Sequence, residues 1–101
     1  MPQEANDLIH QPLRLKIMAA LNGLAARESM EFTRLRSVVE ATDGNLGAHL
    51  SKLEEVGYLT IEKDFIDKKP RTRVALTREG RKALLTHVAY LRDILDSAGG
   101  Q

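Results

Sequence analysis

The sequence predicts a mainly helical domain that carries a small β-hairpin. Apolar residues recur at helical spacing in several segments, separated by stretches rich in glycine, serine and acidic residues. Two short β-rich runs, 58–65 and 72–76, stand between the third and the last of these segments. The chain has 101 residues, which is enough for one domain with one core.

The first helix is expected to begin at Pro12, because a proline at the first helical position loses no hydrogen bond, and to run to about Ala26. A second helix is expected from an N-cap at Thr33 to about Glu40. The linker 29–32 between them could form a minimal strand. The residues expected to face the core are Leu13, Ile17, Leu21 and Leu24 in the first helix and Leu35, Val38 and Val39 in the second.

A third helix is expected over 44–56, after a turn at 41–44. Gly57 should end it, since glycine readily adopts the left-handed conformation of a helix cap. The β-rich runs then form a hairpin around the tip 67–71, and Thr77 caps a last helix over 78–96. Leu46, Leu50 and Leu53 form one stripe on the third helix, which we assign to the core. The predicted domain covers 11–96, with an N-terminal arm at 1–10 and a tail at 97–101.

Composition excludes several kinds of site. The chain has no cysteine, which rules out disulfides, thiolate metal sites and cysteine nucleophiles. No apolar run approaches the roughly 20 residues needed to span a bilayer, and the polar N-terminus is unlike a secretory signal. We therefore expect a cytoplasmic protein. Histidines occur without HxxxH spacing, so neither a metal site nor a cofactor is expected.

Charge is distributed unevenly, although the net charge is only +1. Seven basic residues fall between positions 68 and 82, against the single acid Glu79. A solvated surface would explain such a run, but this one coincides with the predicted hairpin. A helix with a slim outer face followed by a basic hairpin suits a DNA duplex, because the helix can enter the major groove while the hairpin reaches phosphates or the minor groove.

The order helix, (strand), helix, helix, strand, strand, helix is that of a winged helix-turn-helix. The chain resembles the winged-helix regulators of the MarR and ArsR type, in particular their short single-domain group. The matching stretches are QPLRLKI (11–17), DGNL (43–46), HL (49–50), KLE (52–54), GYL (57–59), KPRT (69–72) and LTREG (76–80). The resemblance implies a homodimeric transcriptional regulator that binds a roughly palindromic operator. The cysteine pair of metal-sensing ArsR members is absent, so metal sensing is not implied.

The third helix supplies the residues expected to read the major groove. Asn45 can pair bidentately with adenine, although it could instead cap the helix. Gly47 and Ala48 would let the helix lie deep in the groove, and Lys52 would meet a phosphate. His49 borders the leucine stripe, so a half-buried histidine bonded to the backbone is as plausible as a DNA contact.

The wing, 66–73, supplies the expected electrostatic contacts. Arg71 and Arg73 alternate along a strand and should face one side, where one of them, or Lys69, could enter the minor groove. Pro70 stiffens the tip. The basic residues expected to contact DNA are Lys68, Lys69, Arg71 and Arg73, with Arg34 and Arg36 of the second helix as weaker candidates.

The last helix carries an apolar stripe that is wider than one small domain can cover. We expect a two-fold dimer through this stripe and the start of the chain; the alternative is that the helix folds back on its own core. The residues expected in the dimer are Leu84, Val88, Leu91, Ile94, Leu95, Leu8 and Ile9.

Two other function classes compete with DNA binding. The same fold can bind protein, so a protein–protein interaction module without DNA binding is the alternative. An enzyme is not expected, because no nucleophile or carboxylate pair lies near a histidine and no glycine-rich phosphate loop exists. A small-molecule effector is conceivable between the first and last helices, by analogy with the fold alone.

Overall fold

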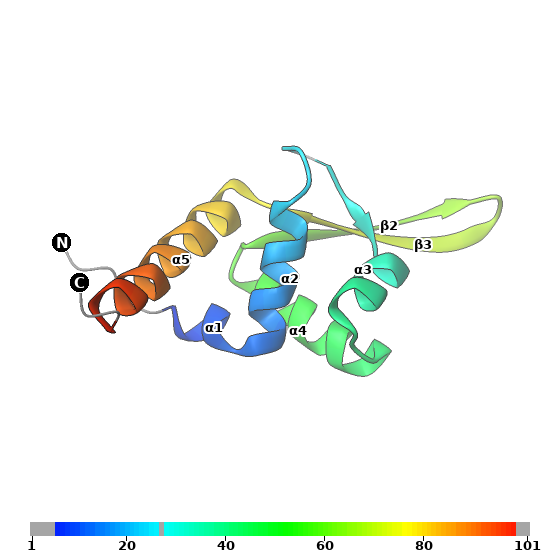
Figure 1. Cartoon of the computed structure of the whole chain (residues 1–101). Coiled ribbons are helices and arrows are strands. Elements are labelled where there is room, and N and C mark those ends of the chain that lie inside the picture. Colours follow the sequence, from blue (N-terminus) through cyan, green and yellow to red (C-terminus); the bar gives the residue numbers. More distant parts are fainter. Residues whose placement is uncertain (1–5, 27, 99–101) are drawn as a thin grey trace.

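A computed structural model describes residues 6–26 and 28–98 and confirms the predicted fold class. Helices pack against a three-stranded antiparallel sheet of order β1-β3-β2. The β2–β3 hairpin projects from one end of the molecule and the last helix from the other (Figure 1). The elements are α1 (Asp7–His10), α2 (Pro12–Asn22), β1 (Met30–Glu31), α3 (Phe32–Val39), α4 (Asp43–Glu55), β2 (Leu59–Ile66), β3 (Lys69–Leu76) and α5 (Arg78–Ala98).

The core lies between α2, α3, α4 and the base of the hairpin. Its buried members come from every element of the described chain. The leucine stripe of α4 is part of it, as predicted: Leu46, Leu50 and Leu53 are all buried. Burying a leucine contributes about 1.5–3 kcal/mol, so this stripe fixes which face of α4 remains outside.

Both ends of α4 have side-chain or backbone caps. At the start, the Asn45 N–H donates to Thr42 Oγ1 at 3.2 Å. At the end, Gly57 has a φ of 83°. Two backbone hydrogen bonds close the helix: the Tyr58 N–H donates to Leu53 O at 3.0 Å, and the Gly57 N–H donates to Glu54 O at 2.9 Å. This is a Schellman cap, in which glycine avoids the steric cost of the left-handed conformation. The predicted role of Gly57 is confirmed.

Thr77 joins the start of α5 to the end of α4. Its hydroxyl donates to Gly57 O at 2.6 Å. The hydroxyl oxygen, Thr77 Oγ1, also accepts a hydrogen bond from the Gly80 N–H at 2.9 Å. The predicted cap is therefore confirmed. It also holds α5 against the turn that leads into the hairpin.

Several predicted boundaries were wrong. The first long helix ends at Asn22 instead of Ala26. The N-cap of α3 is Glu31, one residue before the helix begins, so Thr33 lies inside the helix. Val38 is exposed, because Phe32, Leu35 and Val39 already form the face of α3 that packs on the core.

The predicted N-terminal arm is partly helical. Residues 1–5 lie outside the described residues, but Asp7–His10 forms the one-turn helix α1, and Ile9 is fully buried. Asn6 links this segment to the rest of the fold: its N–H donates to His87 Nδ1 at 3.1 Å, and its side chain donates to the Tyr58 hydroxyl at 3.0 Å. At the other end, the helix α5 extends to Ala98, and residues 99–101 of the predicted tail lie outside the described residues.

His87 is buried beside His10, with 3.4 Å between His87 Nε2 and His10 Nδ1. Because His87 Nδ1 accepts from Asn6, a neutral His87 carries its proton on Nε2 and can donate it to His10. Desolvation, followed by the neighbouring His10, lowers the pKa of His87 below its ordinary value of 6.5. The fold thus favours the neutral ring.

We expect the stability of the protein to fall as the pH drops below 6.5. In that range the unfolded chain binds a proton at position 87 that the folded chain does not, which costs up to about 1.4 kcal/mol per pH unit. Urea unfolding at pH 7.5 and 5.5 measures this loss. His87→Asn keeps an acceptor for Asn6 but cannot titrate, so its loss should be smaller; an equal loss in both proteins would contradict the prediction.

Within 6–26 and 28–98, every helix is too short or too polar to cross a membrane.

Candidate nucleic-acid interface

The helix α4 presents a slim polar surface opposite its leucine stripe. Asn45, Ala48 and Lys52 are exposed there. Thr42, not Asn45, provides the side-chain cap, so the alternative assignment of Asn45 as a capping residue is wrong. The Asn45 amide lies in the first turn of the helix, where recognition helices approach base edges.

Gly47 has no side chain and Ala48 only a methyl group, so this surface of α4 protrudes little beyond the helix backbone. A Cβ built on Gly47 would have no neighbour within 4 Å, so glycine is not required there by packing. Its absence of a side chain leaves space beside the exposed Ala48 methyl. A helix with such a surface has room to approach the floor of a groove closely; the roles of these two positions in DNA binding stay predictions.

His49 is half-buried between α4 and α2. Arg14 Nε donates to His49 Nδ1 at 2.9 Å, so the partner is a side chain and not the backbone. Desolvation and the Arg14 charge both lower the pKa of His49. A neutral ring held by α2 positions α4 on the core. The contact occupies Nδ1, which leaves Nε2 as the ring nitrogen for a DNA contact.

The wing is a long hairpin with a tight turn. The strands β2 and β3 pair from Leu59↔Leu76 to Ile66↔Lys69, which leaves only Asp67 and Lys68 in the turn. Both have positive φ, 50° and 66°, as type I′ turns require. The predicted five-residue tip was therefore too long: positions 69–71 belong to β3.

Arg71 and Arg73 share one face of the hairpin, as their alternation predicted, but they are engaged in ion pairs there. Arg71 makes a two-pronged contact with Asp64, with distances of 2.9 and 2.8 Å. Arg73 reaches Asp64 and Glu62, each at 3.1 Å. The Arg71 hydrogen bond is the main reason that the pKa of Asp64 is lowered, and Asp64 in turn raises the pKa of Arg71. These arginines stiffen the wing, and their charge is largely neutralised within it.

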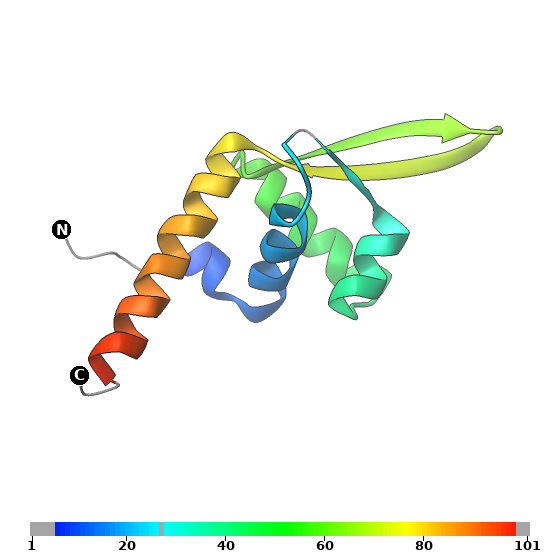
Figure 2. The ribbon, with the colours of Figure 1, turned by 45° about the horizontal axis from the view of Figure 1, so that its top comes forward.

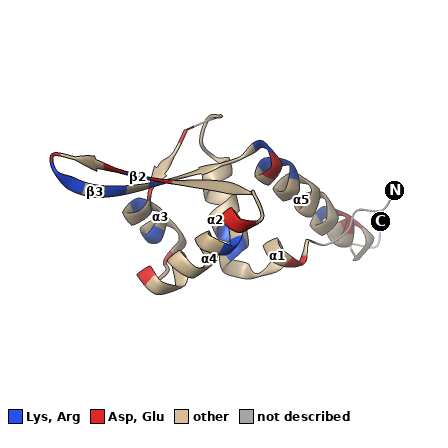
Figure 3. Cartoon of the chain, turned by 180° about the vertical axis from the view of Figure 1, so that it is seen from behind, with Lys and Arg blue, Asp and Glu red and all other residues tan. Residues whose placement is uncertain are grey.

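The exposed lysines of the wing carry the positive charge that remains. Lys68 and Lys69 lie at the turn, as the sequence predicted, and Lys63 lies along β2. Among the residues that the structure describes, none of the three is in an ion pair. Lys63 was missed by the sequence analysis; its alternation with Ile61 and Phe65 in a β-rich run was the available signal. Figure 3 shows the basic residues gathered on β3 and α3 at this end of the molecule.

The two arginines of α3 differ in their surroundings. Arg36 forms an ion pair with Asp43, the first residue of α4, and thereby joins the two helices of the helix-turn-helix. Arg34 is exposed. Of the two, Arg34 is the one whose charge remains available to a phosphate.

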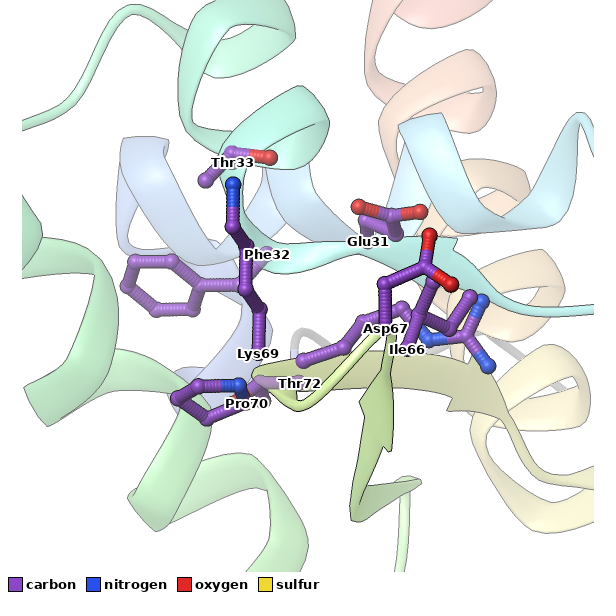
Figure 4. A pocket seen from close by; sticks show the side chains of 9 residues that line it. Glu31, Phe32, Thr33, Ile66, Asp67, Lys69, Pro70 and Thr72 are labelled. Carbon is purple, nitrogen blue, oxygen red and sulfur yellow. The ribbon is translucent and has the colours of Figure 1, made fainter.

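A hollow separates the wing from the start of α3. Its volume is about 380 Å³, and its lining mixes apolar and charged side chains. In Figure 4 the Lys69 side chain points toward Thr33 at the start of α3. The distal wing thus stands clear of the helices instead of packing on them. The lining residues are Glu31, Phe32, Thr33, Ile66, Asp67, Lys69, Pro70, Arg71 and Thr72.

The residues predicted for the dimer fall into two groups. Leu84 and Ile9 are buried in the core of their own chain, so these two positions were wrongly assigned to contacts with a second copy. The reason is that α5 packs on α1 and α2 over its first half. Val88 and Leu8 pack against that core but are only half-buried, and their place in a dimer stays a prediction. Beyond that half, Ile94 and Leu95 are exposed and Leu91 is half-buried, on the part of α5 that projects from the domain (Figure 2).

Comparison with known proteins identifies the fold. A model of the winged helix DNA-binding domain matches residues 13–95. The chain belongs to this family. An uncharacterized protein of Methanocaldococcus jannaschii is 37% identical over 81 residues, which cover 80% of this chain and 85% of that protein. The predicted resemblance to winged-helix regulators is thereby confirmed.

Solved structures show the same architecture. The transcriptional regulator homologue of Pyrococcus horikoshii OT3 has a TM-score of 0.83 and 29% identity, and the match covers 92% of this chain and 89% of that one. A MarR family transcriptional regulator from Silicibacter pomeroyi has a TM-score of 0.68 and 19% identity, and covers 94% and 60% of the two chains. The second likeness concerns the fold alone.

Proposed function

We propose that this winged-helix protein is a transcriptional regulator of the cytoplasm that binds double-stranded DNA in a sequence-specific manner. The helix α4 would lie in the major groove, with Asn45 on a base edge, Ala48 against a thymine methyl and Lys52 on a phosphate. The wing lysines would contact the flanking backbone. The solved relative from Pyrococcus horikoshii, a transcriptional regulator homologue, supports this assignment.

One observation supports the proposal above the others. The start of α4, which carries Asn45, and the turn of the wing, which carries Lys68 and Lys69, lie toward the same end of the molecule, while the end of α5 lies at the other (Figures 1 and 2). A recognition helix and a cationic hairpin on one end can engage one duplex together.

We further propose that two copies associate through the projecting half of α5. Leu95 is 69% exposed, and it lies with Leu91 and Ile94 on the continuation of the face that packs Leu84 into the core. A second copy would cover this face and place two recognition helices about 34 Å apart, one turn of DNA. A palindromic operator would match that symmetry.

The proposal is tested by titrating a labelled duplex at several salt concentrations. Lys68→Ala and Lys69→Ala should weaken binding to every duplex alike and lower the salt slope by about 1 each, because each lysine releases counterions from a phosphate. Arg71→Ala is the matched control in the same strand. Its charge is already paired with Asp64, so the salt slope should change less.

Asn45→Ala should instead keep the salt slope and lose preference at one base position in a selection for bound sequences. Binding that is absent or insensitive to salt would reject DNA as the partner and favour a protein-binding module. Retention of the full sequence preference by Asn45→Ala would reject the role of that side chain.

A further inference from the structure

The two faces of the wing differ in what they offer to a ligand. One face carries the ion-paired group of Glu62, Asp64, Arg71 and Arg73. Directly opposed residues of an antiparallel pair share a face, so the other face carries the pairs Lys63↔Thr72 and Phe65↔Pro70. Apart from the Ile66↔Lys69 pair next to the turn, the first face is occupied by its own ion pairs, whereas the second presents Lys63 beside the apolar pair Phe65↔Pro70.

Phe65 is the most conspicuous side chain on this second face. It is 72% exposed, more than any other exposed large hydrophobic residue of the described chain. It shares the face with Leu59 and Val74, which are buried against the helices at the base of the wing. Alternation along the strands therefore places Phe65 on the same face of the hairpin as these two core residues.

The hairpin holds Phe65 in a rigid setting. Its cross-strand partner Pro70 has a fixed φ, and the next pair toward the base, Asp64↔Arg71, is joined by two hydrogen bonds. The tight turn at Asp67 and Lys68 follows within two residues. Little conformational freedom would be lost if this tip entered a binding site.

We propose that Phe65 is a wedge that enters the minor groove of the duplex and partly unstacks one base step. This inference rests on the proposed DNA-binding function. Lys63 on the same face, with Lys68 and Lys69 at the turn, would contact the phosphates on either side. Apolar wedges between base steps bend DNA by about 20–90°, and the bend brings more backbone within reach of the protein.

The charges around Phe65 favour DNA over a protein partner. Lysine is depleted in the cores of protein–protein interfaces, whereas an exposed aromatic ring with one lysine on its own face and two at the adjacent turn combines a stacking surface with phosphate contacts. The arginines that the sequence analysis proposed for the minor groove are held on the opposite face by Asp64 and Glu62. In this proposal Phe65 and Lys63 replace these arginines as the residues that enter the minor groove. A base step that unstacks easily lowers the cost of the wedge, so TA or CA/TG steps should be preferred where the wing binds.

The test compares wild type with Phe65→Ala on a duplex that carries a selected site. The duplex is labelled at both ends for energy transfer, and 2-aminopurine replaces single bases across the site. Wild type should shorten the end-to-end distance and brighten one 2-aminopurine position. Phe65→Ala should lose both signals and bind roughly tenfold more weakly at every salt concentration, because a buried phenyl group is lost without any charge.

Ile66→Ala is the matched control, since Ile66 adjoins Phe65 but lies on the opposite face and is 45% exposed. It should leave bend, fluorescence and affinity unchanged. If wild type binds the duplex but Phe65→Ala bends and binds it equally well, the wedge is rejected while the DNA-binding function stands. If wild type does not bind duplex DNA, the proposed function itself fails. Normal DNA binding with altered self-association of Phe65→Ala would assign the tip to a protein contact and overturn the inference.

Discussion

Gly80→Ala is expected to destabilise the protein by about 3 kcal/mol or more, the upper range for overpacked sites. A Cβ at this position would lie 2.0 Å from the carbonyl oxygen of Tyr58 and 2.8 Å from its carbonyl carbon. Both atoms are backbone, so no side chain can rotate away. The Tyr58 carbonyl is also tied to the start of α5, because it accepts from the Thr77 N–H at 3.0 Å.

The expected result is a large fall in the urea midpoint with little soluble folded protein at 37 °C. Gly47→Ala is the matched control, because a Cβ there meets no atom within 4 Å and alanine favours a helix interior by about 1 kcal/mol over glycine. It should unfold at the same midpoint as wild type or above it. Equal midpoints for Gly80→Ala and wild type would show that α5 can move away from residue 58 without cost.

This close approach marks a limit of the sequence analysis. Local patterns located Gly57 as a cap and Thr77 as an N-cap, because each role depends on neighbours within a few residues. The requirement for glycine at position 80 arises from a segment 22 residues earlier, and no local pattern reveals that distance. The contact between His10 and His87 was missed for the same reason.

The wing shows how one local error changes a functional assignment. A tip of five residues, 67–71, leaves Arg71 outside the paired strands and free for DNA. The actual two-residue turn places Arg71 directly opposite Asp64. Turn length sets the register of a hairpin, so the error concealed an ion pair. Alternation alone placed Arg71 and Arg73 on one face correctly, but it could not show which acids shared that face.

The periodicity of α5 was predicted well, whereas its division between core and surface was not. Leu84, Leu91 and Leu95 lie at helical spacing on one face, and the pattern is the same along its whole length. Where the domain beneath it ends is a property of the tertiary structure. The first half of the face is buried by α1 and α2, and the second half extends past them.

We expect Leu95→Asp to separate the proposed dimer and to reduce affinity for a two-half-site operator by roughly 10²-fold, through loss of avidity. A charge on the projecting half of α5 would be buried without a partner if two copies met there, and that costs several kcal/mol. The side chain is 69% exposed in the single chain, so the fold itself should tolerate the change. Sedimentation velocity measures the oligomeric state, and duplexes with one or two half-sites measure the affinities.

Leu85→Asp is the matched control. It adds the same charge to α5 outside the proposed interface, and so tests whether any new charge on this helix would disrupt the dimer. Leu85 is 55% exposed on the same helix, but it lies about 100° around the helix axis from Leu84, beside Arg78 and Lys82. It should leave both the mass and the operator affinity unchanged. A monomeric wild type would reject the dimer outright. Dissociation by Leu85→Asp but not by Leu95→Asp would place the interface on the basic side of α5 and overturn the proposal.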